Sequence, residues 1–244
     1  MKNGIIVEWK KIRHKNMLKT SLVIIFLFIT IIVLKDIFIN LRVRELGIES
    51  WIISLDTILI FMIIPAISGI LYTSMINSEY AERTIVNYIS AIVNRNTFIM
   101  SKLIAWMFCH LLMVLIVCLV AYIGSLVIFP TTDLMMRFYD FGVHFLKSAL
   151  FSFFSLALLV PISIFQRSSY VPSIVATLGI AAVGVSATYL TGILPFILPW
   201  TAAFILSQPI SVPNNLKILG YVIIIVFSLL FYILGLVMIN RQDM

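Results

Sequence analysis

The sequence predicts an all-α integral membrane protein, a single domain over residues 1–244 with six transmembrane helices. Its residues are 62% apolar and 11% charged, whereas about 25% of the residues in an ordinary soluble domain are charged. Apolar stretches of about 20 residues, enough for a helix to cross a hydrocarbon layer of ~30 Å, recur along the chain. They must be helices, because the alternating strands of a membrane barrel are absent. They cover about residues 20–40, 55–76, 103–129, 146–165, 170–190 and 217–239.

The basic residues predict the orientation of these spans, because Lys and Arg near span ends favour the cytoplasm. Six spans put both termini on one side, and eleven of the seventeen basic residues fall on that side. Both termini are therefore expected in the cytoplasm. The net charge of +7 indicates contact with anionic membrane lipid. No nucleic acid partner is expected, because no basic patch carries interleaved aromatic residues.

Residues 1–19 predict an amphipathic helix in the cytoplasmic interface. Trp9 belongs to an apolar stripe at i, i+4, i+7, and charged residues such as Lys11 occupy another face. We expect Trp9 to point inward, with Lys11 and Arg13 facing lipid phosphates. A basic anchor that only sets the orientation is the alternative.

Residues 77–97 form a charged, helix-patterned segment between the second and third spans. Glu79 and Glu82 stand in the first turn, where the helix dipole favours carboxylates. Behind an apolar stripe, the segment exposes small polar residues that include Asn87 and Ser90. Such a helix on the cytoplasmic side suits docking onto another protein, and a solvated loop helix is the alternative.

The chain is not expected to be an enzyme and offers neither a catalytic nor a metal site. Its three histidines are scattered, and none of its ten glycines opens a G-x-x-x-x-G-K-[ST] phosphate loop. No cofactor is therefore expected on this chain. Any ATP-driven work must come from a partner chain, which would hold the ATP and Mg.

Residues 191–213 form an apolar connection before the last span that contains four of the eight prolines. Pro195 and Pro199 rule out a straight span, and Trp200 is typical of a membrane interface. We expect a re-entrant hairpin on the outer face that acts as a lid. An ordinary surface loop is the alternative.

The fifth span carries small residues on one face, where another helix could approach closely. They are Ala176, Gly179, Ala182 and Ser186.

Ionisable residues inside spans are expected to have partners, because each is costly when unpaired. We expect His110 to be satisfied near Ser101 or Cys109, with a place on a translocation path as the alternative. Asp56 is expected to pair with Lys35 or Lys147 rather than to relay protons. His144 is expected to extend outward with Lys147.

The charged segment resembles the cytoplasmic loop of type-two ABC exporter permeases. In the pattern E79-x-x-x-R83-T84 … R95 … K102, an acidic residue, an Arg after a short turn and a Lys that opens the third span recur as in that family. The region of Glu8, Lys11 and Arg13 is similar to the family's N-terminal interface helix. The likeness covers essentially the whole chain and is greatest to the lantibiotic-immunity and toxic-peptide exporter branch.

The resemblance implies that the chain is the transmembrane subunit of an exporter in a bacterial cell membrane, moving a bacteriocin, a cytolytic peptide or a drug-like molecule. Its partners would be two copies of an ABC ATPase and a second permease, identical or paralogous. Lys102 would form the hinge between the coupling helix and the third span. A membrane assembly or anchoring protein without transport is the alternative. The resemblance assigns the ATPase contact to Glu79, Glu82, Arg83, Asn87, Ser90, Arg95 and Lys102.

Overall fold

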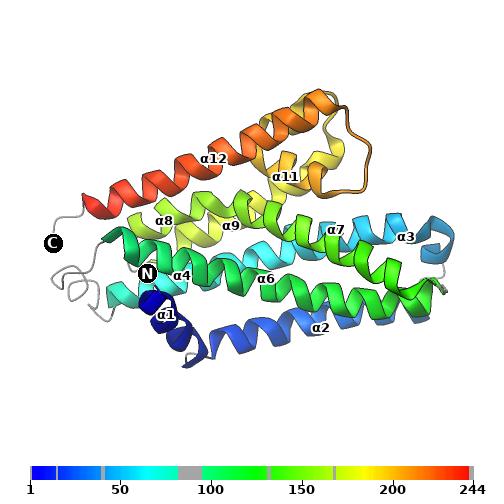
Figure 1. Ribbon diagram of the computed structural model, residues 1–244, viewed down its shortest axis with the longest axis horizontal. Coiled ribbons are helices and arrows are strands. Elements are labelled where there is room, and N and C mark those ends of the chain that lie inside the picture. The colour runs from blue at the N-terminus through cyan, green and yellow to red at the C-terminus, as the bar shows by residue number, and fades with distance from the viewer. Residues whose placement is uncertain are drawn as a thin grey trace.

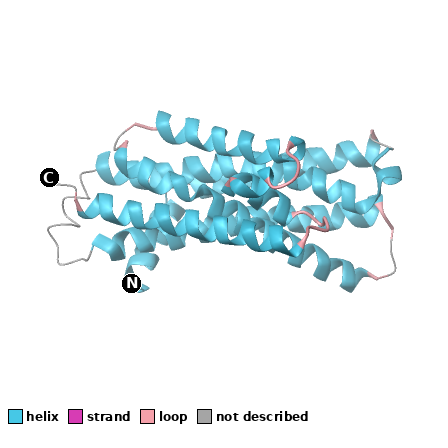
Figure 2. Ribbon diagram, turned by 90° about the horizontal axis from the view of Figure 1, so that it is seen from above, coloured by secondary structure: helices cyan, strands magenta, loops and turns pink. Residues whose placement is uncertain are grey.

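The computed structural model describes residues 2–14, 16–39, 42–81, 95–130, 133–166 and 169–241. All regular secondary structure in these ranges is helical (Figure 2). The prediction of six spans is confirmed by the length and composition of the helices. The six that are long and apolar enough to cross a membrane are Met17–Phe38, Val43–Ala81, Asn96–Ile128, Leu134–Phe165, Val171–Tyr189 and Asn214–Asn240.

The long helices run side by side along the longest axis of the molecule (Figure 1). Helix α1 (Lys2–His14) and the last turn of α12 (Asn214–Asn240) lie at one end, which we call the N-terminal end. The end of α2 (Met17–Phe38) and the start of α3 (Arg42–Leu55) lie at the other, which we call the opposite end. An even number of spans has therefore brought both ends of the chain to the same side of the bundle.

Helix α1 is separate from the first span and meets it at a sharp turn (Figure 1). Asn16, directly before α2, has a left-handed backbone with φ of 52°. Asparagine tolerates this conformation better than most residues with a side chain. The chain can therefore change direction there, and α1 turns back against the bundle and contacts α6 (Arg95–Ile128).

The second span is much longer than residues 55–76, the range that hydropathy predicts. It is built from α3, a π-helical segment η1 (Asp56–Ile63) and α4 (Ile64–Ala81). Within α3 the helix is broken at Gly47, where φ is 81° and ψ is 166°, a backbone that favours glycine. Charged residues in α3 hide its helical continuation from a hydropathy scan.

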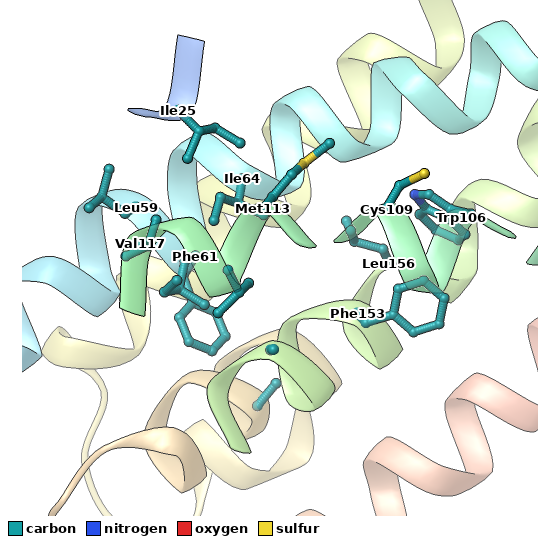
Figure 3. Packing of buried hydrophobic residues seen from close by; sticks show 14 of the residues in the cluster. Ile25, Leu59, Phe61, Ile64, Trp106, Cys109, Met113, Val117, Phe153 and Leu156 are labelled. Carbon is teal, nitrogen blue, oxygen red and sulfur yellow. The ribbon is translucent and has the colours of Figure 1, made fainter. Parts of the chain in front are cut away.

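The core of the bundle lies between α4 with η1, α6, and α7 (Leu134–Ser155), which continues through η2 (Leu156–Leu158) into α8 (Leu159–Phe165). Figure 3 shows Phe61, Trp106 and Phe153 among the side chains that meet there. At 34 residues and 1.5 Å per residue, α6 is about 50 Å long. It therefore extends well beyond a hydrocarbon layer of ~30 Å.

The fifth span, α9 (Val171–Val185) with η3 (Ser186–Tyr189), packs with a different face from the predicted one. Its buried residues include Ser173, Thr177 and Ile180, and a Cβ added at Gly69 of α4 would lie 2.6 Å from the Thr177 hydroxyl. Gly179 instead faces open space. Of the predicted small-residue face, Ala176 is partly buried against the core, whereas Gly179 and Ala182 are exposed.

The connection to the last span contains two short helices, α10 (Leu194–Ile197) and α11 (Pro199–Ser207). Pro195 and Pro199 stand in their first turns, where a missing N–H costs nothing. Thr201 donates from Oγ1 to the carbonyl oxygen of Pro195 at 2.7 Å. The two helices are packed against α7, α9 and α12.

Candidate functional site

Four charged side chains meet at the N-terminal end of the bundle and join α1, α4 and α6. Lys102 Nζ lies 2.9 Å from Glu8 Oε2 and 3.0 Å from Glu79 Oε1. It also donates to the carbonyl oxygen of Met75 at 3.3 Å. Lys11 Nζ approaches the same Glu79 oxygen at 2.7 Å. We call Glu8, Lys11, Glu79 and Lys102 the ion-pair cluster.

The spacing of residues along each helix explains why the side chains of the ion-pair cluster face one another. Lys102 and Trp106 are four residues apart on α6, so that they share a face directed to α4. On α4, Met75 and Glu79 have the same spacing. On α1, the Trp9 ring packs edge-on against Phe108 with centroids 5.1 Å apart, and this contact sets α1 against the side of α6.

The ion-pair cluster combines charge balance with burial. The side chains of Lys102, Glu79 and Glu8 are 1%, 2% and 4% exposed, and that of Lys11 is 34% exposed. Counted over the described residues, the cluster holds two ammonium groups and two carboxylates, whose charges sum to zero. Buried charges require this pairing, and removing one partner of a buried pair costs about 3–5 kcal/mol. The cluster therefore fixes the three helices to one another.

Several predicted docking residues belong to the part of the chain that the structure does not describe. Residues 82–94, which contain Glu82, Arg83, Asn87 and Ser90, lie outside the described residues. Arg95 begins α6 and Arg13 belongs to α1, but their side chains are also outside the described part. Of the predicted residues, Trp9, Lys11, Glu79 and Lys102 are brought together.

Glu79 differs in environment from a surface docking residue. Its carboxylate is directed into the ion-pair cluster, so that contact with a partner protein would require those ion pairs to open. Glu8 was not singled out as a site residue. The signal for it was indirect: Lys102 stands in an apolar helix and needs carboxylates, but the sequence does not say which.

His110 is buried in the middle of the bundle with partners other than those predicted. Its Nδ1 lies 3.0 Å from Ser68 Oγ and its Nε2 lies 2.9 Å from Ser152 Oγ. Trp106 Nε1 also donates to Ser68 Oγ at 2.8 Å. The prediction of a satisfied histidine is thus met, but the prediction of Ser101 or Cys109 as its partner is wrong.

Asp56 also pairs differently from the prediction. Its Oδ2 lies 2.9 Å from His144 Nε2 and accepts a hydrogen bond from Ser148 at 2.9 Å. Lys35 instead lies 3.2 Å from Asp36. His144 turns inward because the buried carboxylate offers it a partner. The prediction that His144 extends outward is therefore wrong.

The predicted lid residues lie within the packed part of the bundle. Pro195 and Pro199 are buried. Trp200 donates from Nε1 to the carbonyl oxygen of Ser155 at 2.8 Å, and its ring meets Phe227 with centroids 5.3 Å apart. The segment is thereby attached to both α7 and α12.

No group of three or more His, Cys, Asp or Glu residues that could hold a metal ion occurs in the part of the chain that the structure describes.

The helices and the buried ion-pair cluster define a multi-pass membrane protein of the α-helical class. The chain belongs to the family described as ABC-2 family transporter protein, whose family model matches residues 4–184, well over half of the sequence. The match runs from α1 into α9 and includes the whole ion-pair cluster. A comparison with curated proteins found no match.

Membership of this family gives the chain its general role. It is the membrane component of a transporter, of ABC-2 permease type, and the family implies an ABC ATPase as partner. This agrees with the prediction that the chain is a transport subunit rather than an enzyme.

Proposed function

We propose that the chain is the transmembrane subunit of an exporter that moves an amphipathic or hydrophobic substrate out of a bacterial cell. The substrate class is a bacteriocin, a cytolytic peptide or a drug-like molecule, as in the toxic-peptide exporter branch. A separate ATPase, present in two copies and holding ATP and Mg, would drive the movement. A second permease, identical or paralogous, would complete the path.

The observation that carries this proposal is the ion-pair cluster at the end of the second and third spans. The connection of residues 82–94 leaves α4 two residues after Glu79 and enters α6 seven residues before Lys102. A force applied to this connection would act on both helices together, because their ends are joined by Lys102. The cluster also includes α1, so that the interfacial helix would move with them.

The docking surface is proposed to lie in residues 82–96, with Glu82, Arg83, Asn87, Ser90 and Arg95 as contacts. Glu79 and Lys102 would then transmit the movement from inside the cluster. The chain would lie in the cell membrane with both termini and the docking surface in the cytoplasm, and α1 would contact the lipid headgroups.

The test is a co-purification of the ATPase with charge-reversal variants. Glu82→Lys with Arg83→Glu should leave the permease folded and inserted, while the co-purifying ATPase and export both fall at least tenfold. Glu45→Lys, at the opposite end, is the matched control and should change neither.

Two results would contradict the proposal in different ways. If the ATPase and export survive the double variant unchanged, the docking assignment is wrong. If the intact complex hydrolyses ATP but moves no solute when reconstituted in vesicles, the chain is an assembly or anchoring protein.

A further inference from the structure

A cavity of about 460 Å³ lies toward the opposite end of the bundle, between α3, α7 and the connection that precedes α12. This volume is within the range of small-molecule sites. The polar groups on its wall are mostly carboxylates. The lining residues that matter here are Glu49, Ile52, Asp140, Phe141, His144 and Pro209.

Among the residues that the structure describes, the carboxylates that line this cavity outnumber its single arginine. Neither Glu49 nor Asp140 forms a salt bridge within the described ranges, and both are exposed. Arg137 also lines the cavity. Its Nη1 donates to the carbonyl oxygen of Ser125 at 3.1 Å and to that of Phe129, at the end of α6. These neutral carbonyls orient the guanidinium group but leave its positive charge, which offsets one of the carboxylates.

A buried carboxylate lies behind the inner wall. Asp56 is one turn deeper than Ile52, and His144, which lines the cavity, is in contact with it. Asp56 is 0% exposed, and its Oδ1 has no hydrogen-bond partner within the described part of the chain. Buried polar atoms are nearly always paired, so that an orphan oxygen here indicates a donor that the described residues do not supply.

A second orphan polar group directly precedes a residue of the cavity wall. Gln208, directly before Pro209, is 3% exposed, and both its amide atoms lack partners among the described residues. Phe61 and Phe204 meet with ring centroids 5.2 Å apart. Gln208 follows the end of α11 and directly precedes Pro209, which lines the cavity.

We infer that this cavity binds an organic cation, an ammonium or guanidinium group carried on an apolar body. The N–H groups of such a ligand would be donors for the carboxylates, and its charge would offset theirs. The apolar wall of Ile48, Ile52 and Phe141 would contact its carbon skeleton. A metal ion fits less well, because the described residues contain no cluster of three metal-ligating side chains.

This site goes beyond the proposed export function and does not depend on an ATPase. Binding can be measured on the purified chain alone, so that its failure and the failure of the export proposal are separate results.

The probe is 2-phenylethylamine, with the neutral 2-phenylethanol as its uncharged analogue, measured by calorimetric titration at pH 7.5 in detergent. The amine should bind at least tenfold more tightly than the alcohol. The double variant Glu49→Gln/Asp140→Asn should weaken amine binding at least tenfold and leave the thermal unfolding midpoint unchanged, because both side chains are exposed. Glu45→Gln removes an exposed carboxylate of α3 that does not line the cavity and should bind the amine normally.

Three results would overturn the inference. Equal binding of amine and alcohol would reduce the cavity to an apolar pocket. Undiminished binding to the double variant would place the amine elsewhere. Calcium ions that displace the amine at micromolar concentration would indicate a metal site in place of an organic cation site.

Discussion

Lys102 carries a charge into a site where its side chain is 1% exposed, and it can do so because two carboxylates reach it from different helices. Its ammonium also meets the carbonyl oxygen of Met75. An ammonium group donates three hydrogen bonds, and these three acceptors match that number. The residue is therefore fully satisfied, and its loss would leave Glu8 without its cation and take one cation from Glu79.

We predict that Lys102→Met lowers the stability of the protein by about 3–5 kcal/mol, because Glu8 and Glu79 lose their shared cation. For a chain of this size, this corresponds to a fall of about 10 °C in the unfolding midpoint. Thermal unfolding of the purified protein in detergent measures it. Adding Glu8→Gln should restore much of the loss, because Lys11 then still neutralises Glu79.

The matched control is Lys19→Met, which removes an exposed lysine from α2. Its unfolding midpoint should stay within about 2 °C of the parent protein. If Lys102→Met unfolds like this control, the ion-pair cluster does not hold the three helices together.

The sequence predicts that buried polar residues need partners, but it does not identify the partners. His110 and Ser152 are 42 residues apart, and Asp56 and His144 are 88 residues apart. Only the packing of the helices decides which polar side chains meet. Of the two predicted partners of Asp56, Lys35 pairs with Asp36 instead and Lys147 acts on Asp56 through its charge, whereas packing placed a histidine in direct contact with the carboxylate.

At the scale of the helices, the sequence largely predicted which segments span the membrane, but it did not predict where each span begins and ends. Runs of about 20 apolar residues gave all six, because the cost of polar groups in hydrocarbon leaves few alternatives. The second span extends over Val43–Ala81. Its first part was missed because the charged residues of α3 lower the average hydropathy there. The face of α9 that packs within the chain was also not predictable, because small residues permit a close contact without specifying the partner.

The unoccupied face of α9 fits the proposed second permease. Gly179 has no atom within 4 Å of an added Cβ, so that Gly179→Leu is tolerated in the single chain. We predict that it lowers permease pairing at least fivefold, because a larger side chain prevents close helix approach. Cross-linking in native membranes, scored as the fraction of paired permease, measures this.

Gly142→Leu is the matched control, since Gly142 also has open space around an added Cβ but lies on α7. Pairing should be unchanged in that variant. Equal pairing in both variants would exclude α9 from the permease interface.

Helices α10 and α11 form the segment proposed as the outer lid. Pro195 and Pro199 fix φ in the first turns of the two helices, so that the path between them is set in advance. We predict that the double variant Pro195→Ala/Pro199→Ala loosens closure, with export reduced and leakage of small reagents increased. ATP hydrolysis by the complex should persist, because the proposed docking surface lies at the other end of the bundle.

Normal export by a tightly sealed double variant would contradict the lid. The hydrogen bond from Trp200 to Ser155 offers a check on folding, since its indole environment should be retained in tryptophan fluorescence of the variant.

Across the whole molecule, charge and helix number together predict the orientation in the membrane. The chain brings α1 and the end of α12 to one end of the bundle. Eleven of the seventeen basic residues belong to that end or to the connections on its side. Basic residues next to spans are retained on the cytoplasmic side, and the same end carries the ion-pair cluster and the connection proposed to dock an ATPase. The orientation in the membrane and the docking proposal thus depend on each other. If the orientation were reversed, a cytoplasmic ATPase could not reach the proposed docking surface.

We therefore predict that, in intact cells, a cysteine at position 44 is labelled by a membrane-impermeant maleimide and a cysteine at position 241 is not. Arg44 and Arg241 are exposed residues at opposite ends of the bundle. The native Cys109 and Cys118 are buried and should contribute little background. After the membrane is permeabilised, position 241 should be labelled as fast as position 44, which shows that its thiol is reactive. Rapid labelling at position 241 in intact cells would invert the topology, and with it the proposed site of the ATPase.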